Sequence, residues 1–270
     1  VTGELVCGDE TLPEEELAKN RCDFGDEIFE HPLDDSYHRE RSADWDKITT
    51  PLLTAANWGG QGLHLRGNFE GYVRAASKNK WLEGHGLEHW TEFYTAYGIE
   101  LQKRFFGHFL KGEDTGWDKQ PPVQLLVRHL DRFEKRLEED WPIPRTIWTK
   151  FYLDPDGMRL TDAAPTSSAT LSFDALGDGL TFMSDPLASE TEITGPSAAK
   201  LMGSSSTEDA DLFVVLRVFD GSGEEVTFQG AIDPHTPIGQ GWLRASHRKL
   251  DPSLSQPWRP YHTHDETQLL

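Results

Sequence analysis

The feature that most constrains the fold is a change in the spacing of apolar residues near residue 120. Before the segment Gly116–Pro122, short apolar runs alternate with segments of helical periodicity, and after it apolar residues recur at every second position. Alternating strands and helices are typical of an α/β unit with a parallel sheet, and a series of short strands is typical of a β-sandwich. The sequence therefore predicts an α/β region over residues 1–118 and an all-β region over residues 119–270.

Two expected strands in the α/β region each lead into a glycine-rich turn. The apolar run at residues 50–58 leads into Gly59–Gly62, and the shorter run Lys80–Glu83 precedes Gly84-His85-Gly86. Short apolar runs that end in such turns are typical of buried strands. Because the carboxyl ends of parallel strands meet at one edge of a sheet, we expect both turns to lie side by side.

Helical periodicity places two helices in the same region. Residues 67–77 and 99–110 carry apolar side chains on one helical face, and Gly112 is a natural stop for the second helix. Residues 1–45 form a polar, acidic lead-in segment, with a helix expected to begin near Thr11. Residues 30–45 have no clear period and are expected to form a loop.

The all-β region contains eight segments with the alternation of strands, separated by clusters of Gly, Pro, Asp and Ser. These are residues 123–129, 146–153, 169–173, 190–194, 199–202, 212–219, 225–232 and 242–246. The apolar run at Leu212–Phe219 is nearly continuous, so this strand is expected to be buried at the centre of an antiparallel sandwich.

Charge and composition exclude several classes of partner. The formal net charge is −20, from 46 acidic and 26 basic residues, so nucleic acid and anionic membrane surfaces are not expected as partners. No apolar run approaches the length of a membrane span, and no cofactor is expected. The only cysteines are Cys7 and Cys22. We interpret them as reduced thiols of a cytoplasmic protein, with a single Cys7–Cys22 bridge as the alternative.

Histidines follow the second expected strand, where reacting groups of an α/β sheet are found. His85 comes directly after the strand between two glycines, which suits a general base that turns into a cleft. His89 lies one helical turn further on and is the alternative. The chain contains no Gly-x-Ser-x-Gly motif, so a Ser-His-acid site cannot be completed from this sequence alone.

A weaker constellation lies near the end of the chain. His262 and His264 alternate and precede Asp265, and alternate residues of a strand share a face that could bind a metal. No further group of potential metal ligands lies nearby in the sequence. A polar tail is therefore the favoured interpretation, and no metal site is expected.

Several strings together resemble the α/β-hydrolases of the Xaa-Pro dipeptidyl-peptidase and cocaine-esterase type. They are residues 51–67, 80–86 and 105–112, similar to the last part of the catalytic domain, and residues 139–152, 183–186 and 194–205, similar to the jelly-roll domain that follows it. The resemblance implies an α/β-hydrolase sheet followed by a jelly-roll β-sandwich. It also implies hydrolysis of small esters or amides through an acyl-serine, with His85 or His89 as the catalytic histidine.

This sequence departs from the family pattern in three ways. Gly60 stands where the family usually has an acid after the tryptophan of the first turn, so Asn57 or Glu88 becomes the candidate to orient the imidazole. The nucleophile-bearing half should precede residue 1, and the jelly roll should continue beyond Leu270. We therefore expect a histidine-bearing fragment that needs the N-terminal half of the same protein as its partner, and that alone is neither active nor self-sufficient in folding.

A competing hypothesis is a non-catalytic jelly-roll module for binding or assembly. The fold class does not decide between this and the hydrolase hypothesis. A homo-oligomer is compatible with both.

Overall fold

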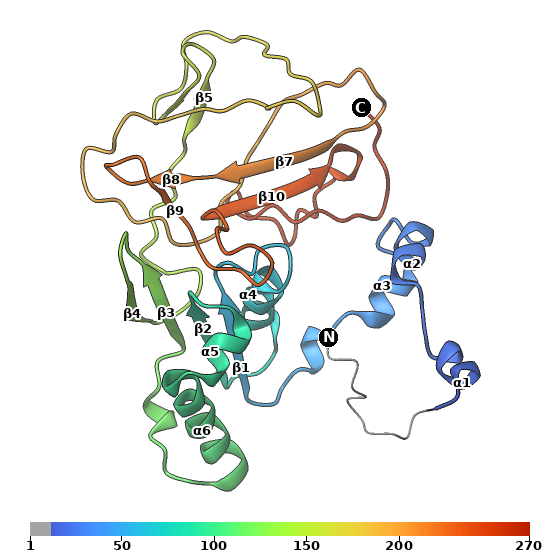
Figure 1. The fold of residues 1–270 in the computed structure, drawn as a ribbon, viewed down its shortest axis with the longest axis vertical. Helices are drawn as coiled ribbons and strands as arrows, with labels where there is room; N and C mark the ends of the chain where they lie inside the picture. The colour runs from blue at the N-terminus through green and yellow to red at the C-terminus, as the bar shows by residue number, and fades with distance from the viewer. Residues whose placement is uncertain (1–11) are drawn as a thin grey trace.

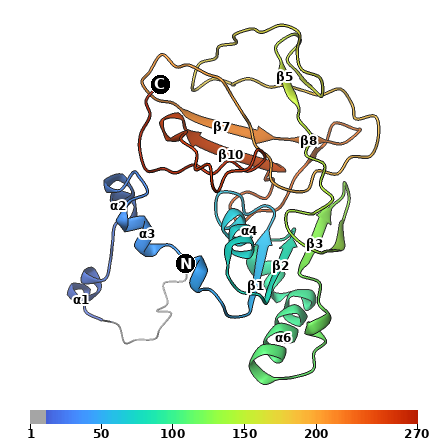
Figure 2. The same cartoon turned by 180° about the vertical axis from the view of Figure 1, so that it is seen from behind.

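The computed structural model describes residues 12–270 (Figures 1 and 2). It begins with three short helices, α1 (Glu14–Lys19), α2 (Phe24–Glu30) and α3 (Ser36–Arg41). None of them buries a residue, and both views show them to one side of the remaining chain. The segment expected to be a loop thus contains α3, because the Asp35 side chain accepts a hydrogen bond from the Tyr37 N–H and caps that helix. Thr11 and Cys7 lie outside the described residues.

A four-stranded mixed sheet forms the α/β part, with strand order β1-β2-β3-β4. The strands are β1 (Leu52–Asn57), β2 (Lys80–His85), β3 (Val123–Arg128) and β4 (Phe133–Glu138). The first three strands are parallel to one another, and β4 pairs with β3 in the antiparallel sense. The sheet therefore continues past residue 118. The change in the spacing of apolar residues near residue 120 follows the last helix of the α/β part, and it does not mark the end of the sheet.

Along the chain, the α-helices of this part lie between the parallel strands (Figure 1). They are α4 (Leu65–Arg74), α5 (His89–Tyr94) and α6 (Ala96–Lys111), with short 3₁₀ turns η1 (Trp45–Lys47) and η2 (Trp117–Lys119). The helix α6 ends as predicted at Gly112, whose φ of 68° is a left-handed conformation that glycine adopts without strain. Between residues 12 and 270, no helix combines the length and apolarity needed to cross a membrane.

Strand β2 supplies side chains to both faces of the sheet, because successive residues of a strand point in opposite directions. Leu82 belongs to a buried cluster with Tyr72 of α4 and Leu125 of β3. Its neighbour Trp81 packs against the cluster formed by Leu101, Phe105 and Trp117, on the face covered by α6. Residues 83 and 85 share the face of Trp81, so both point toward the α6 side.

The second half of the chain contains only short antiparallel pairs. They join β5 (Tyr152–Asp154) to β6 (Arg159–Thr161), β7 (Asp211–Leu216) to β10 (Gly239–Arg244), and β8 (Val218–Phe219) to β9 (Glu225–Val226), with η3 (Ala245–His247) after β10. The strands expected at residues 169–173, 190–194 and 199–202 are absent. Their apolar side chains are exposed, as at Phe173 and Met202, so no partner strand or core holds these segments extended.

The expectation of a buried central strand at Leu212–Phe219 is also wrong. The segment does form strands β7 and β8, but Phe213 is 74% exposed and Val215 is 51% exposed. A strand becomes central when other strands flank both its edges, and within residues 12–270 β7 pairs only with β10.

A buried carboxylate at the end of β4 makes stability depend on pH. Glu138 is 5% exposed, accepts a 2.7 Å hydrogen bond from Arg145 and lies 2.6 Å from the Arg136 guanidinium. The hydrogen bond from Arg145, supported by the Arg136 charge, holds the pKa of the Glu138 carboxyl below its usual value of 4.5. Because the folded-state pKa is the lower one, this stabilisation is present above pH 4.5 and is lost as pH falls through the folded-state pKa.

Glu138→Gln is therefore expected to lower the unfolding free energy by about 2 kcal/mol at pH 7, the contribution of hydrogen bonds to a charged group. The difference from the wild type should shrink steadily below about pH 4.5, because the wild-type carboxyl then becomes neutral as well. Urea unfolding between pH 3 and pH 7 measures this difference. A difference independent of pH would contradict the assigned ion pair.

Candidate active site

The carboxyl ends of β1 and β2 lie in register, which brings the two glycine-rich turns together. Asn57 pairs with His85 across the parallel strands, and the Trp58 N–H donates a 2.9 Å hydrogen bond to the His85 carbonyl. His85 is the last residue of β2 and is 2% exposed. It therefore lies at the end of a parallel strand beside the turn after β1, where the sequence predicted it.

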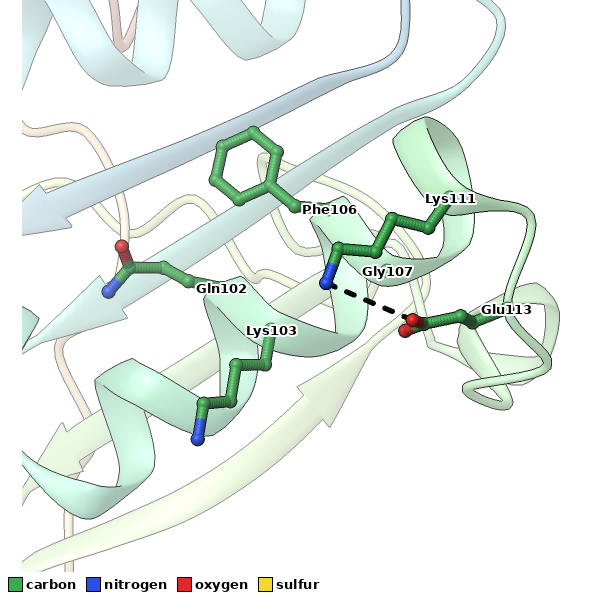
Figure 3. Close-up of a pocket in the computed structure, with 6 residues that line it drawn as sticks. All are labelled: Gln102, Lys103, Phe106, Gly107, Lys111 and Glu113. Carbon is green, nitrogen blue, oxygen red and sulfur yellow. Dashed lines mark ion pairs between the residues drawn. The ribbon is translucent and has the colours of Figure 1, made fainter.

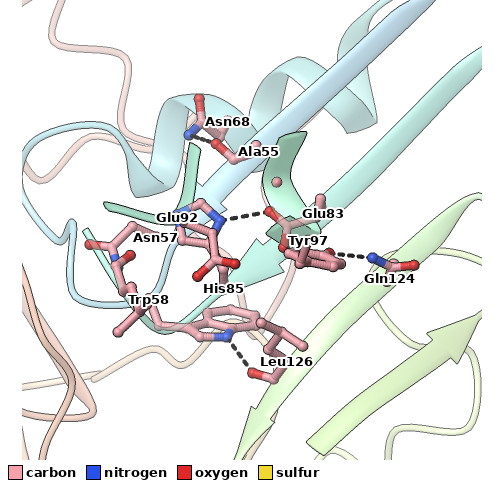
Figure 4. A network of polar contacts seen from close by, with 12 residues as sticks. Ala55, Asn57, Trp58, Asn68, Glu83, His85, Glu92, Tyr97, Gln124 and Leu126 are labelled. Atoms are coloured by element: carbon pink, nitrogen blue, oxygen red, sulfur yellow. Dashed lines mark hydrogen bonds and ion pairs between the residues drawn. The ribbon is translucent and has the colours of Figure 1, made fainter. Parts of the chain in front are cut away.

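His85 forms a buried hydrogen bond with a carboxylate on its own strand (Figure 4). The distance from its Nδ1 atom to Oε2 of Glu83 is 2.6 Å, and both side chains are almost completely inaccessible to solvent. The two residues are two positions apart on a strand, so they lie on the same face of the sheet. A hydrogen bond to an ionised carboxylate is the arrangement that fixes which ring nitrogen of a histidine carries a proton.

Two further polar groups hold Glu83. The Tyr97 hydroxyl of α6 donates a 3.0 Å hydrogen bond to Oε1 of Glu83, and the amide of Gln124 on β3 donates in turn to the Tyr97 oxygen (Figure 4). Burial and the Glu83 charge raise the pKa of the Tyr97 hydroxyl, so it remains a neutral donor. Gln124 is paired with Glu83 in the register of β2 and β3, which explains why both point to the α6 side.

The other ring nitrogen of His85 is buried and unbonded. Its Nε2 atom has no hydrogen-bond partner among residues 12–270. Native structures rarely leave a buried polar atom unpaired, and each exception calls for an explanation. An imidazole with Nδ1 bonded to a carboxylate and Nε2 available can accept a proton from a hydroxyl group at Nε2.

Other titratable groups surround His85. The ring of His89 lies 5.5 Å from that of His85 in an edge-on arrangement, and His64 lies 5.3 Å from His89 on its other side. Burial lowers the pKa of His89, and the neighbouring imidazoles of His85 and His64 lower it further. Burial raises the pKa of the Glu92 carboxyl on α5, the neighbouring His85 opposes this rise, and the Glu83 charge adds a smaller rise. Both effects favour neutral side chains next to the Glu83–His85 pair.

Neither residue expected to orient the imidazole does so. The Asn57 amide donates to the carbonyls of Leu87 and Gln229, at 2.6 and 3.1 Å, and Glu88 accepts from the Gln229 side chain. The partner of His85 is Glu83, which the sequence interpretation treated only as the end of a strand.

The second half of the chain forms one wall of the site. Gln61 in the turn after β1 donates a 2.9 Å hydrogen bond to the Pro237 carbonyl. A Cβ atom added to Gly59 would lie 2.4 Å from the Gln229 carbonyl oxygen. Gly62 has a φ of 77° and touches the Trp242 ring, so only glycine fits there. Segment 229–242 therefore packs directly on the turn after β1.

The surface of residues 12–270 is hollowed at two places that bear on the site. One adjoins the turn after β2 and is lined by Gly86, Leu87, Arg128, Asp131, Arg132, Phe133, Thr227, Phe228, Gln229, Pro234 and His235. The other is a shallow depression on α6 beside the Lys111–Glu113 ion pair (Figure 3). The hollow on α6 contains no histidine or hydroxyl side chain, and the hollow beside the turn after β2 is lined by neither His85 nor His89.

The histidines near the end of the chain lie apart from this site. His264 contacts His247, with 3.0 Å between their Nδ1 atoms, and His262 lies 6.1 Å from His264 between ring centroids. Within residues 12–270, no three His, Cys, Asp or Glu side chains are arranged to hold a metal ion.

Comparison with known proteins identifies relatives that cover between 59% and 92% of this chain. A family model described as the X-Pro dipeptidyl-peptidase C-terminal non-catalytic domain matches residues 115–263. Cocaine esterase from Rhodococcus sp. (strain MB1 Bresler) is 26% identical, over 69% of this chain and 41% of the esterase. A putative serine esterase from Mycobacterium bovis is 28% identical, over 59% of this chain and 28% of that protein.

Solved structures extend the likeness beyond residues 115–263. A crystal structure of a CocE/NonD family hydrolase from Staphylococcus aureus superposes with a TM-score of 0.84 at 32% identity, covering 92% of this chain and 46% of that one. The chain thus spans less than half the length of each of these relatives. Since the family model covers more than half of the chain, the chain belongs to the family of X-Pro dipeptidyl-peptidase and cocaine-esterase-like proteins and corresponds to their C-terminal part.

Proposed function

We propose that this chain carries the general base of a serine acyl hydrolase that acts on small esters or amides, and that the base is His85. The observation that carries the proposal is the state of the two ring nitrogens. Nδ1 is bonded to a buried carboxylate, and Nε2 is buried without a partner among residues 12–270. This is the geometry in which a histidine removes the proton of an attacking hydroxyl group.

The proposed reaction has two stages. Nε2 of His85 accepts the proton of a serine hydroxyl while the serine oxygen bonds to the carbonyl carbon of the substrate. The protonated imidazole then gives this proton to the departing alcohol or amine, which leaves an acyl-serine. In the second stage a water molecule loses a proton to Nε2 and attacks the acyl carbon, and the proton finally returns to the serine oxygen.

The nucleophilic serine is proposed to lie on a polypeptide segment outside these 270 residues. The sequence contains no Gly-x-Ser-x-Gly motif, and the chain spans less than half the length of its relatives. Two of these relatives are named as esterases. The natural partner is therefore the nucleophile-bearing N-terminal half of the same protein.

Residues 115–263 are proposed to shape the site without taking part in chemistry, with the strands of this region belonging to a jelly-roll sandwich. Two observations support this part of the proposal. The matching family model is described as non-catalytic, and segment 229–242 packs on the turn after β1. The competing hypothesis of a purely non-catalytic module accounts less well for the buried Glu83–His85 pair, which lies outside that range.

A serine-directed fluorophosphonate probe tests the function. We expect the probe to label the complete protein at one serine outside these 270 residues, and to abolish hydrolysis of p-nitrophenyl esters in parallel. Peptide mapping by mass spectrometry locates the label, and heat-unfolded protein is the control for non-specific reaction. A stoichiometric label on any serine within residues 1–270, or hydrolysis that survives complete labelling, would contradict the proposal.

A further inference from the structure

We infer that Glu83 is the positioning residue of this site: its carboxylate holds His85 in the tautomer and orientation that general-base catalysis needs. The inference rests on the proposed function of His85 and adds the identity of the orienting acid. No acid follows the tryptophan of the first turn, where Gly60 stands, so this turn does not supply one.

The geometry of the pair is that of a strong charge-assisted hydrogen bond. The Nδ1–Oε2 distance is 2.6 Å, and the exposed fractions of the His85 and Glu83 side chains are 3% and 2%. Water therefore does not compete for the carboxylate. When the Glu83 carboxyl accepts from Nδ1–H, the lone pair of the imidazole is left on Nε2.

The carboxylate itself is held from three elements of the fold. Glu83 is on β2, the Tyr97 hydroxyl that donates to its other oxygen is on α6, and the Gln124 amide that donates to Tyr97 is on β3. Gln120 extends the series, since its side-chain amide donates to Gln124 at 3.2 Å. Donors therefore reach both oxygens of Glu83, which stops the carboxylate from rotating away from His85.

The other carboxylates near the site do not compete for this role. Within residues 12–270, Glu92 has a side-chain hydrogen bond only from Thr95, and Glu88 is bonded to Gln229. Burying a charge is costly unless it is paired, and replacement of a buried pair by apolar residues is often neutral or stabilising. Stability alone therefore does not explain why a carboxyl group and an imidazole are buried together at the end of β2.

Replacing Glu83 by Gln in the complete protein tests the inference. An amide can accept from Nδ1–H or donate to Nδ1, and donation leaves the proton on Nε2, where it blocks base catalysis. We expect kcat for a p-nitrophenyl ester to fall by about 10³- to 10⁴-fold, the size found when a triad carboxylate becomes an amide, with KM changed by less than about threefold. The pH–rate profile is recorded as well, because a purely structural role of Glu83 would leave it unchanged.

A matched control is Glu138→Gln, which removes a buried carboxylate of the same sheet that makes no contact with His85. It should destabilise the protein and leave kcat and the pH profile unchanged. Glu83→Asp keeps the charge and should recover part of the lost activity. If Glu83→Gln does not fold, Tyr97→Phe decides the question, with an expected fall in kcat of about three- to tenfold, the effect of one hydrogen bond to the carboxylate.

The outcomes separate this inference from the proposed function. Labelling of a serine together with loss of activity in His85→Gln, but unchanged kcat and pH profile in Glu83→Gln or Tyr97→Phe, would overturn the inference and leave the function standing. Absence of serine labelling, with full activity in His85→Gln, would overturn the function itself.

Discussion

Replacing His85 by Gln is expected to lower kcat/KM of the complete protein for p-nitrophenyl esters by at least about 10⁴-fold, as for other serine hydrolases that lose their base. Glutamine has nearly the same reach as histidine but no basic nitrogen, so the serine hydroxyl would keep its proton. The substitution is expected to leave the pairing of β1 with β2 intact. The Trp58 N–H bonds to the backbone carbonyl of residue 85 and not to its side chain. Initial rates, normalised to the fraction of folded protein, measure the effect.

Two other histidine substitutions complete this experiment. His108→Gln is the control. His108 lies in the last turn of α6 against Phe109, away from the carboxyl ends of β1 and β2 where His85 lies. His89→Gln tests the alternative base and is expected to lower kcat/KM by less than about tenfold. Loss of activity in His89→Gln with retention in His85→Gln would assign the base to His89.

Replacing Trp117 by Ala is expected to have the largest effect on stability, about 3–5 kcal/mol. Trp117 is fully buried, and its ring lies 5.2 Å from that of Phe105 and 5.4 Å from that of Trp81, between centroids. Its indole N–H has no partner among residues 12–270, so the substitution removes packing and no hydrogen bond. Native-state hydrogen exchange of the α6 amides measures the free energy of local opening.

The control for the tryptophan substitution is Phe106→Ala on α6. Phe106 is 49% exposed, so its truncation is expected to cost less than about 1 kcal/mol. Equal losses in the two variants would mean that α6 is not held to the sheet through Trp117.

Strong periodicity predicted the α/β part well. The strands β1 and β2 and the helices α4 and α6 lie where apolar spacing placed them, because each buries one face against the sheet or lies within it. Strand β4 was missed, since Phe133–Glu138 has three consecutive charged residues and no alternation of apolar residues. Three strands expected in the second half are absent, because alternation alone does not supply the neighbouring strand that makes a segment extended.

The position of the candidate residues was predicted in part. His85 was proposed from its position after a strand and does end β2, but the strand was expected to end at Glu83, two residues too early. With β2 extended to His85, residues 83 and 85 fall on one face, and this alternation is the signal that would have revealed the acid. The contributions of Tyr97 and Gln124 depend on how α6 and β3 pack against β2, which no local pattern contains.

The placement of Glu83 and His85 on one six-residue strand has a consequence for how the site assembles. An acid and a base brought together from separate loops meet only after the entropy of closing those loops has been lost. Here two peptide units tether the groups, so their effective concentration is high as soon as β2 adopts an extended backbone. The orientation of the His85 ring by Glu83 is therefore a local property of the sheet, and it should be insensitive to changes of length in the loops around it.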